Sequence, residues 1–366
     1  MVLLNPVRGS AIGERFQRLP LFLNWVPGLS LCSNPGLKLA NAFGVEDQMT
    51  KLPLLLLAML LLQACTERSV TNQPTHAAPN AYLDYSGRDD LLSGGVKMIA
   101  VNTPKGVFHV WTKRVGNNPT IKVLMLHGGP GATHEYLEAL DSYFPVAGIE
   151  YYYYDQLGSA YSDQPNEAEL WDLPRFVEEV EQVRQALKLD KNNFYLFGQS
   201  WGGLLAMEYA LKYQQNLKGL IISNMMASGP AYNEYAHKVL MPAMDQKALA
   251  EVQQLEAKKD YENPRYMQLL IPQHYEHHIL RMPYDQWPDP VKRAFKHLNP
   301  AIYIPMQGPS ELGLSGKLLN WDRTNDLPKI TVPTLVIGAK YDTMDPAHMA
   351  VLNSGPFHHG LPLTRH

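Results

Sequence analysis

The 366-residue chain has few cysteines, no excess of one charge and no long apolar run. Its two cysteines, Cys32 and Cys65, cannot build a disulfide framework or a cysteine-rich metal site. Its 32 basic and 35 acidic residues give a net charge of −3, which excludes the chain-wide basic field typical of nucleic-acid-binding proteins. No apolar run reaches the roughly 18 residues of a membrane-spanning helix. With 45% hydrophobic and 18% charged residues, the composition instead indicates a globular protein with one large domain or a core with an insertion.

One short apolar run, over residues 52–62, has the features of an export signal. Lys51 precedes it, and it ends in Leu62-Gln63-Ala64-Cys65, which resembles the lipobox of bacterial lipoproteins. The resemblance implies a signal peptide over residues 49–64 and lipidation of Cys65. A buried core helix with a chance cysteine is the alternative, but the unbroken leucines leave no polar helix face. We therefore expect a protein anchored by lipid in the bacterial cell envelope.

The lipobox divides the first 80 residues into three parts. Residues 1–48 show no sustained helical or strand period and are interpreted as a non-native upstream extension, with Met49 as the native start. Residues 65–80 are polar and contain two prolines, which predicts a tether between the anchor and the folded body. Thr66, rather than an aspartate, follows the cysteine. In Gram-negative lipoproteins this residue implies the periplasm-facing outer membrane.

The body of the chain alternates between short β-rich runs and helical periods. Strands are predicted at 96–101, 107–115, 121–126, 149–154, 194–197, 217–222 and 334–337, and helices at 174–189 and 204–213. Such alternation predicts an α/β fold whose mostly parallel sheet carries helices on both faces. Residues 228–321 lack a strand pattern and are rich in Met, Tyr, His and Pro, so we interpret them as a helical cap. The core then comprises residues 81–227 and 322–349.

The strongest local signal for chemistry is Gly198-Gln199-Ser200-Trp201-Gly202, between a predicted strand and a predicted helix. This is the G-x-S-x-G pattern of a nucleophile elbow. The two glycines keep side chains out of a tight turn, and the turn exposes the hydroxyl of Ser200 above the sheet. The pattern therefore predicts a nucleophilic serine at position 200.

A second glycine-rich turn, His127-Gly128-Gly129-Pro130-Gly131, also follows a predicted strand. An oxyanion hole needs two amides, one from the residue after the serine and one from a loop of this kind. We therefore expect the amides of Trp201 and Gly129 to be the donors. A glycine turn without a catalytic role is the alternative for this segment alone. His127 is expected to be a structural residue of the loop rather than the catalytic base.

Together these segments resemble the proline iminopeptidase branch of the α/β-hydrolase superfamily. Asp155-Gln156-Leu157-Gly158-Ser159-Ala160-Tyr161-Ser162 is similar to the family's D-Q-x-G-x-G-x-S loop, with Ala160 in place of the second glycine. Three further matching segments are Met306-Gln307-Gly308-Pro309-Ser310-Glu311, Asn320-Trp321-Asp322 and Gly338-Ala339-Lys340-Tyr341-Asp342. The resemblance covers about residues 94–349 and implies an α/β-hydrolase core with an inserted cap.

The resemblance also implies roles for individual residues. Ser200 is the nucleophile, Asp342 the acid that orients a histidine, and Glu311 the cap carboxylate that holds the free amino terminus of the substrate. Asp345 competes for the role of the acid, but it precedes Pro346, and this order is typical of a helix N-cap.

The implied reaction is release of an N-terminal proline or small apolar residue from short peptides through an acyl-enzyme, without metal or organic cofactor. The expected partners are therefore peptides with a free amino terminus and, through the lipid, a membrane; nucleic acid is not among them. An esterase or amidase with the same residues is one alternative. A catalytically inactive, peptide-binding lipoprotein is another.

The last residues do not match the family pattern. In the family, the catalytic histidine lies on a loop after a further strand, and a closing helix follows. Residues 350–366 hold no strand run and no helical period, so we interpret them as an aberrant tail, truncated or frameshifted, in a chain without its last strand and helix. His358 and His359 are the remaining candidates for the base. The chain as written is expected to be inactive or misfolded, and peptidase activity would refute this expectation.

Overall fold

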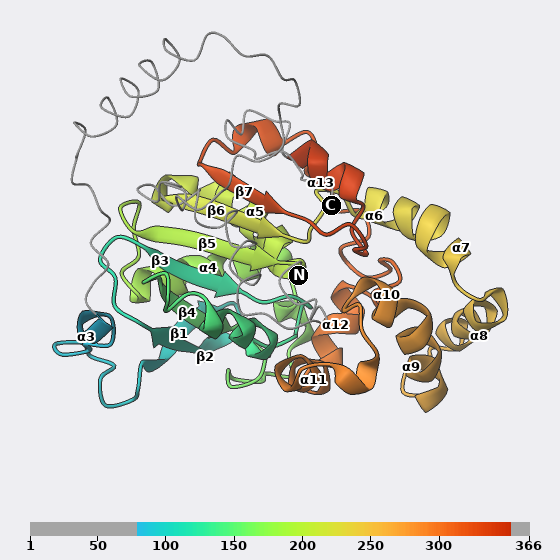
Figure 1. Ribbon diagram of the computed structural model, residues 1–366, viewed down its shortest axis with the longest axis horizontal. Helices are drawn as coiled ribbons and strands as arrows, with labels where there is room; N and C mark the ends of the chain where they lie inside the picture. The colour runs from blue at the N-terminus through green and yellow to red at the C-terminus, as the bar shows by residue number, and fades with distance from the viewer. Residues whose placement is uncertain (1–78, 353–366) are drawn as a thin grey trace, which may run out of the picture. The chain divides into compact units, whose positions relative to one another are not determined.

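A computed structural model describes residues 79–352. Seven strands form one sheet in the order β1-β2-β4-β3-β5-β6-β7 (Figure 1). Their bounds are β1 Val96–Thr103, β2 Gly106–Val115, β3 Lys122–Leu126, β4 Glu150–Asp155, β5 Phe194–Gln199, β6 Gly219–Ser223 and β7 Thr334–Ile337. β1 pairs antiparallel with β2, and β2 with β4, whereas the remaining neighbours pair in parallel. The α/β fold with a mostly parallel sheet is confirmed.

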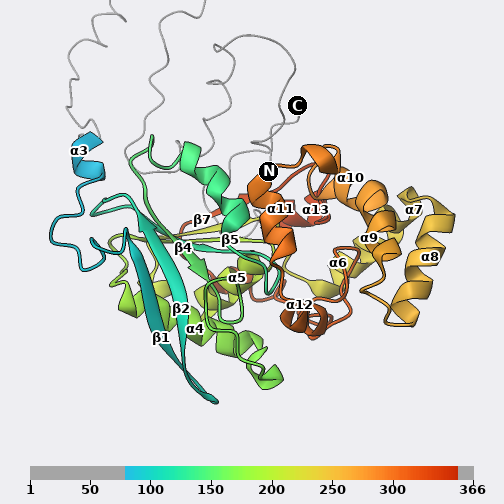
Figure 2. The same ribbon diagram turned by 90° about the horizontal axis from the view of Figure 1, so that it is seen from below.

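β4, β5 and β6 are buried on both faces, whereas β7, at the edge of the sheet, is half-buried. Every residue of β4 and β6 is buried, and so are the first five residues of β5. Such continuous burial explains the unbroken apolar and aromatic runs, because helices cover both faces of a parallel sheet. Figure 2 shows α4 (Leu173–Ala186) and α5 (Trp201–Tyr213) on one face and η3 (Glu135–Ser142) on the other.

A helical region follows β6 and ends before β7. Its elements are α6 Gly229–Tyr235, η6 Ala236–Leu240, α7 Met241–Ala243, α8 Gln246–Ala257, α9 Pro264–Leu270, η7 Ile271–Tyr275, α10 Glu276–His278, η8 Tyr284–Gln286, α11 Asp289–Lys296 and α12 Pro300–Met306. The two ends of this region meet, since Ser228 and Asp322 form an antiparallel bridge and the Ser228 hydroxyl donates to the Asp322 carboxylate at 2.8 Å. The cap therefore leaves and re-enters the core at one point.

The remaining short elements connect or flank the sheet. They are α3 Pro79–Tyr82, η4 Ala168–Leu170, η5 Gln214–Asn216, η9 Leu327–Lys329 and α13 Pro346–Leu352. No helix within residues 79–352 is both long and apolar enough to cross a membrane.

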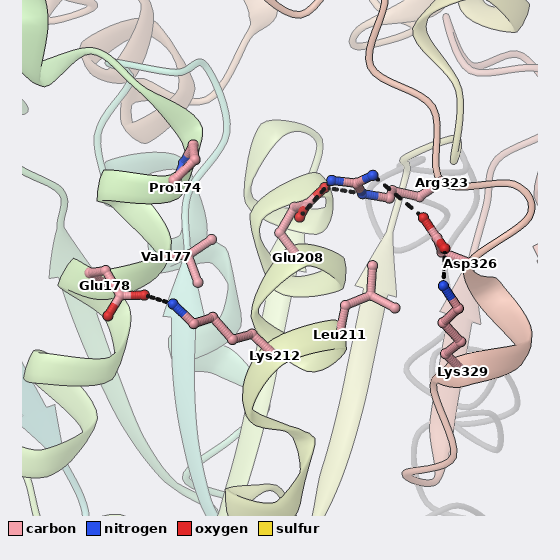
Figure 3. Close-up of a pocket in the computed structure, with 9 residues that line it drawn as sticks. All are labelled: Pro174, Val177, Glu178, Glu208, Leu211, Lys212, Arg323, Asp326 and Lys329. Atoms are coloured by element: carbon pink, nitrogen blue, oxygen red, sulfur yellow. Dashed lines mark hydrogen bonds and ion pairs between the residues drawn. The ribbon is translucent and has the colours of Figure 1, made fainter.

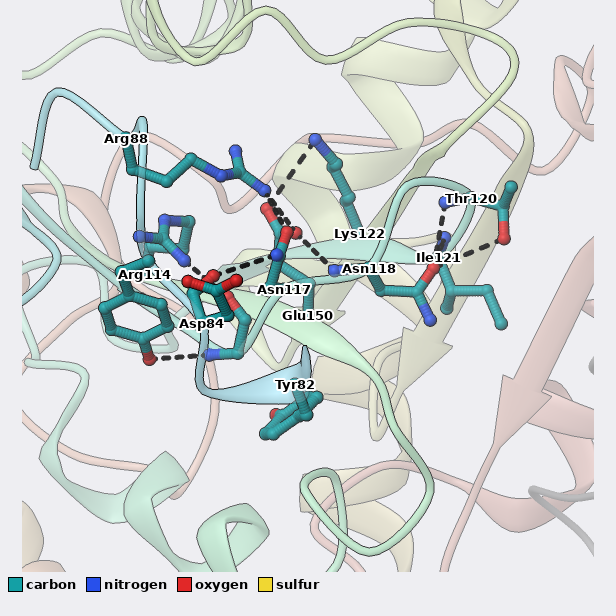
Figure 4. A network of polar contacts seen from close by, with 12 residues as sticks. Tyr82, Asp84, Arg88, Arg114, Asn117, Asn118, Thr120, Ile121, Lys122 and Glu150 are labelled. Carbon is teal, nitrogen blue, oxygen red and sulfur yellow. Dashed lines mark hydrogen bonds and ion pairs between the residues drawn. The ribbon is translucent and has the colours of Figure 1, made fainter. Parts of the chain in front are cut away.

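The first described segment is fastened to the start of β4 (Figure 4). The fully buried carboxylate of Glu150 accepts hydrogen bonds from the Arg88 guanidinium at 3.1 Å and the Asn118 amide at 2.7 Å. Tyr82 is buried and donates its hydroxyl to the Ile149 carbonyl at 2.8 Å. α3 begins at Pro79, so its first two residues fall within the segment 65–80 that the sequence predicts to be a tether.

The other end of the described chain also differs from expectation. The tail was predicted to begin at residue 350 without a helical period, but α13 continues to Leu352. Leu352 is 1% exposed and belongs to the main hydrophobic core, so tertiary packing extends the helix. The proposed export signal, Cys65, His358 and His359 lie outside the described residues.

Candidate active site

Ser200 occupies a strained turn between β5 and α5. Its backbone has φ 54° and ψ −125°, a region that L-residues rarely adopt. A Cβ atom on Gly198 would lie 2.0 Å from the Gly202 carbonyl oxygen, and one on Gly202 would lie 2.1 Å from the Leu126 carbonyl oxygen. Only glycine fits at these two positions. The expected steric basis of the G-x-S-x-G pattern is therefore present in the structure.

The glycine-rich loop after β3 lies against this turn. A Cβ atom on Gly128 would lie 3.3 Å from the Ser200 Cβ atom, and Gly129 has a φ of 110° that favours glycine. Within residues 79–352, neither the Gly129 amide nor the Trp201 amide donates a hydrogen bond. Both predicted oxyanion donors thus lie on segments that meet at Ser200.

His127 is fully buried and fully engaged at the base of this loop. Its Nδ1 atom lies 2.8 Å from the Gly128 carbonyl oxygen, and its Nε2 atom accepts a hydrogen bond from the Gln156 amide at 3.1 Å. Burial lowers the pKa of His127 to about 4, so the ring stays neutral near neutral pH. A ring with both nitrogens occupied cannot reach the Ser200 proton, which agrees with the structural role expected for it.

Asp342 lies on the loop that follows β7, at the same edge of the sheet as the ends of β5 and β6. It is 7% exposed, and its carboxylate accepts hydrogen bonds from the Asn224 side chain and from the Met344 amide. Burial raises the pKa of Asp342, and these hydrogen bonds oppose the rise. Asp345 instead accepts from the Ala347 amide at 2.8 Å, which is the helix-capping contact expected for it.

Asn224 is a site residue that sequence reasoning did not identify. It follows β6 with a φ of 52°, and its amide donates to the Ile337 carbonyl of β7 at 2.8 Å. Asparagine tolerates this left-handed backbone better than most residues. The strained turn aims its side chain at the Asp342 carboxylate. No sequence motif marks this residue.

Glu311 is fixed in the cap by four aromatic side chains. Its Oε1 atom accepts a hydrogen bond from the Tyr303 hydroxyl at 2.5 Å. Its carbonyl accepts from the Tyr232 hydroxyl at 2.7 Å and lies 3.1 Å from the Nε2 atom of His274, and its amide donates to the Tyr275 hydroxyl at 3.3 Å. Both the backbone and the side chain of Glu311 are therefore oriented by the cap.

The Glu311 carboxylate carries no cationic partner within residues 79–352. Burial raises its pKa, the Tyr303 hydrogen bond opposes the rise, and the negative charge of Asp342 adds to it. Glu311 belongs to the segment that closes the cap, whereas Asp342 belongs to the loop after β7. Glu311 is partly buried; removing a carboxylate from water without a cation is costly, and a ligand ammonium would relieve that cost.

No histidine within residues 79–352 forms a hydrogen bond with Ser200 or Asp342. His278 contacts the acid loop, with its Nδ1 atom 3.0 Å from the Tyr341 carbonyl oxygen. The candidates His358 and His359 lie outside the described residues, so their role stays a prediction. The same residues, 79–352, contain no cluster of three His, Cys, Asp or Glu side chains suited to a metal ion.

A pocket of about 360 Å³ is lined by residues of α4, of α5 and of the segment 323–329 (Figure 3). Its charged groups pair with one another: Lys212 with Glu178, Arg323 with Glu208, and Lys329 with Asp326. Ser200, Asp342 and Glu311 do not line this pocket. The charged groups of this pocket are therefore engaged in ion pairs with one another.

The strand-end serine, the paired glycine loop and the buried acid define a hydrolase of the α/β-hydrolase class. Residues 122–360 match the family model described as alpha/beta hydrolase fold. Relatives of 60% and 59% identity show that the chain belongs to the proline iminopeptidase branch of this family.

Two curated relatives and one solved structure support this assignment. A proline iminopeptidase of Flavobacterium johnsoniae is 60% identical over 252 residues, covering 69% of this chain and 84% of the relative. One of Elizabethkingia meningoseptica is 59% identical over 254 residues, with the same coverage. The crystal structure of a Mycobacterium smegmatis proline iminopeptidase is 26% identical with a TM-score of 0.62, covering 73% of this chain and 89% of that one.

Proposed function

We propose that the protein is a serine aminopeptidase that releases an N-terminal proline or small apolar residue from short peptides. The observation that carries this proposal is Glu311, whose carboxylate has no cationic partner among residues 79–352 and is oriented in the cap by hydrogen bonds with Tyr303, Tyr232 and Tyr275. A carboxylate in this position binds the ammonium of a free amino terminus and so places the first peptide bond at the nucleophile. The names of the relatives agree with this substrate class.

In the proposed mechanism the Ser200 hydroxyl attacks the first peptide carbonyl while a general base removes its proton. The amides of Gly129 and Trp201 stabilise the negative charge that develops on the carbonyl oxygen. Collapse of the tetrahedral intermediate expels the shortened peptide, which takes up the proton. Water then hydrolyses the acyl-enzyme and releases the N-terminal residue. Asp342 orients the base, for which His358 and His359 are the candidates.

Blocking the substrate amine tests the proposed substrate class. Acetylation of a prolyl anilide removes the ammonium and leaves the Glu311 carboxylate without its partner, so we expect at least a ~100-fold preference for the free-amine substrate. The measurement is kcat/KM for both anilides. If this chain gives no turnover, a chimera with the C-terminal region of the Flavobacterium johnsoniae relative supplies the comparison. Equal cleavage of both substrates would favour an esterase or amidase. Peptide binding without turnover would favour an inactive binding protein.

We also propose that the mature protein is lipid-anchored through Cys65, by virtue of the segment Leu62-Gln63-Ala64-Cys65. Several acyl chains on one cysteine bind a membrane firmly, since each buried methylene contributes about 0.8 kcal/mol. After expression in a bacterial host, mass spectrometry should find an acylated N-terminus at residue 65 in the membrane fraction. The Cys65→Ser variant should lose the modification and leave that fraction. An unmodified Cys65 within a longer chain would contradict the anchor.

A further inference from the structure

One tyrosine hydroxyl joins the two segments that meet at Ser200. The Gly128 amide donates to the Tyr136 hydroxyl oxygen at 2.7 Å, and that hydroxyl donates to the Gln199 Oε1 atom at 2.6 Å. Gly128 directly precedes Gly129, and Gln199 directly precedes Ser200. Tyr136 therefore connects the neighbour of one proposed oxyanion donor to the neighbour of the nucleophile.

A second side chain, Gln156, makes an independent bridge between the same two segments. Its Oε1 atom accepts from the Trp201 indole nitrogen at 2.8 Å. On the other side, its backbone amide donates to His127 Nε2 at 3.1 Å, and its Nε2 atom donates to the His127 carbonyl at 3.2 Å. Gln156 is fully buried, so water cannot reach its polar atoms, and these protein hydrogen bonds satisfy them instead.

The Tyr136 bridge lies directly beside the nucleophile. A Cβ atom placed on Gly128 would be 3.0 Å from Gln199 Oε1 and 3.3 Å from both the Tyr136 hydroxyl and the Ser200 Cβ atom. The ring of Tyr136 also packs against the hydrophobic cluster of the cap. Burial raises the pKa of Tyr136, so its hydroxyl keeps its proton and can donate and accept at the same time.

We propose that Tyr136 is a positioning residue of the oxyanion hole, fixing the Gly129 amide relative to Ser200. The inference rests on the proposed function, since it assigns a role within that reaction. An oxyanion donor acts only when it is held about 2.7–3.1 Å from the place where the oxyanion forms. Tyr136 holds the loop from its Gly128 side, and Gln156 holds it from its His127 side.

Replacing Tyr136 by phenylalanine tests the inference, because the ring remains while the Gly128 amide and Gln199 Oε1 lose their partner. Removing an oxyanion donor outright costs about 10²–10³-fold in kcat. Because the Gln156 bridge remains, we expect a smaller loss of about 10-fold in kcat, with KM for a prolyl anilide unchanged. The matched control is Tyr143→Phe, since the Tyr143 hydroxyl makes no hydrogen bond within residues 79–352.

Inhibitor binding separates positioning from general damage. A boronic acid analogue of proline forms a tetrahedral anion on the serine, whereas prolinamide binds only as a ground-state ligand. Tyr136→Phe should weaken the boronate about 10-fold and leave prolinamide binding unchanged. Wild-type kcat and boronate affinity in Tyr136→Phe, or equal losses for both ligands, would overturn the inference.

Failure of the proposed function has a different signature. A wild-type chain that binds no prolinamide and cleaves no prolyl anilide would contradict the aminopeptidase proposal rather than the role of Tyr136. Amide hydrogen exchange over residues 126–131 then decides the inference. Faster exchange in Tyr136→Phe than in Tyr143→Phe would support it, and equal exchange in the two variants would overturn it.

Discussion

Ser200→Ala is expected to lower kcat for a prolyl anilide by about 10⁴- to 10⁶-fold, the range that follows loss of a serine nucleophile. The comparison is made in this chain or, where it gives no turnover, in the chimera with the C-terminal region of the Flavobacterium johnsoniae relative. The residual rate would come from substrate binding and the two amides of Gly129 and Trp201. The fold should be unaffected, because the Ser200 hydroxyl makes no hydrogen bond within residues 79–352 and alanine meets the same backbone strain as serine. Steady-state kinetics and a thermal unfolding curve measure the two effects separately.

Covalent labelling gives an independent measure of the same residue. A fluorophosphonate should add its mass to the peptide that contains Ser200 in the wild-type chain and leave Ser200→Ala unmodified. The control is Ser142→Ala, since Ser142 is exposed at the last residue of η3. Substantial turnover by Ser200→Ala, or labelling at another serine, would show that the nucleophile lies elsewhere.

The sequence predicted the sheet and the elbow because both depend on local patterns. Continuous apolar runs mark strands that are buried on both faces, and the seven predicted strands match the seven observed ones within a few residues. The glycines around Ser200 are required by contacts within one turn, with the Gly198 clash coming from Gly202 only four residues later. Such short-range constraints leave a readable motif.

The features that sequence could not predict depend on contacts between distant segments. Asn224 reaches Asp342 only because β6 and β7 are neighbours, and Tyr136 reaches Gln199 only because η3 returns over the β5 turn. The C-terminal end of the folded body differs from the prediction for the same reason. Leu352 lies beyond the predicted end at residue 349 and is buried in the core, a contact that is not visible in local composition.

Glu311→Gln is expected to lower kcat/KM for a free-amine substrate by about 10–150-fold, the equivalent of a charged hydrogen bond of roughly 1.5–3 kcal/mol. Glutamine preserves the shape and can still accept the Tyr303 hydroxyl, so only the charge is lost. An N-acetylated substrate should show no such loss. Unchanged kcat/KM for the free amine would mean that the substrate ammonium binds elsewhere.

The raised pKa of Glu311 also gives the variant a characteristic pH dependence. Ammonium binding needs the ionised carboxylate, so wild-type kcat/KM should fall as the pH drops through that raised pKa. In Glu311→Gln this part of the acid limb should disappear. If the pH profile of kcat/KM in Glu311→Gln keeps the same fall at low pH, that fall belongs to the titration of another group.

Stability should change in the opposite direction to activity. Because the pKa of Glu311 is higher in the folded than in the unfolded chain, the unfolded chain binds fewer protons in that pH interval, and folding stability falls as the pH rises through it. Above that interval the glutamine variant, which has no charge to bury, should unfold at a higher urea concentration than the wild type. The control is Glu234→Gln on α6, where the Lys238 hydrogen bond lowers the carboxyl pKa, so no gain is expected. A Glu311→Gln protein that loses both activity and stability would indicate that Glu311 supports the cap rather than the substrate.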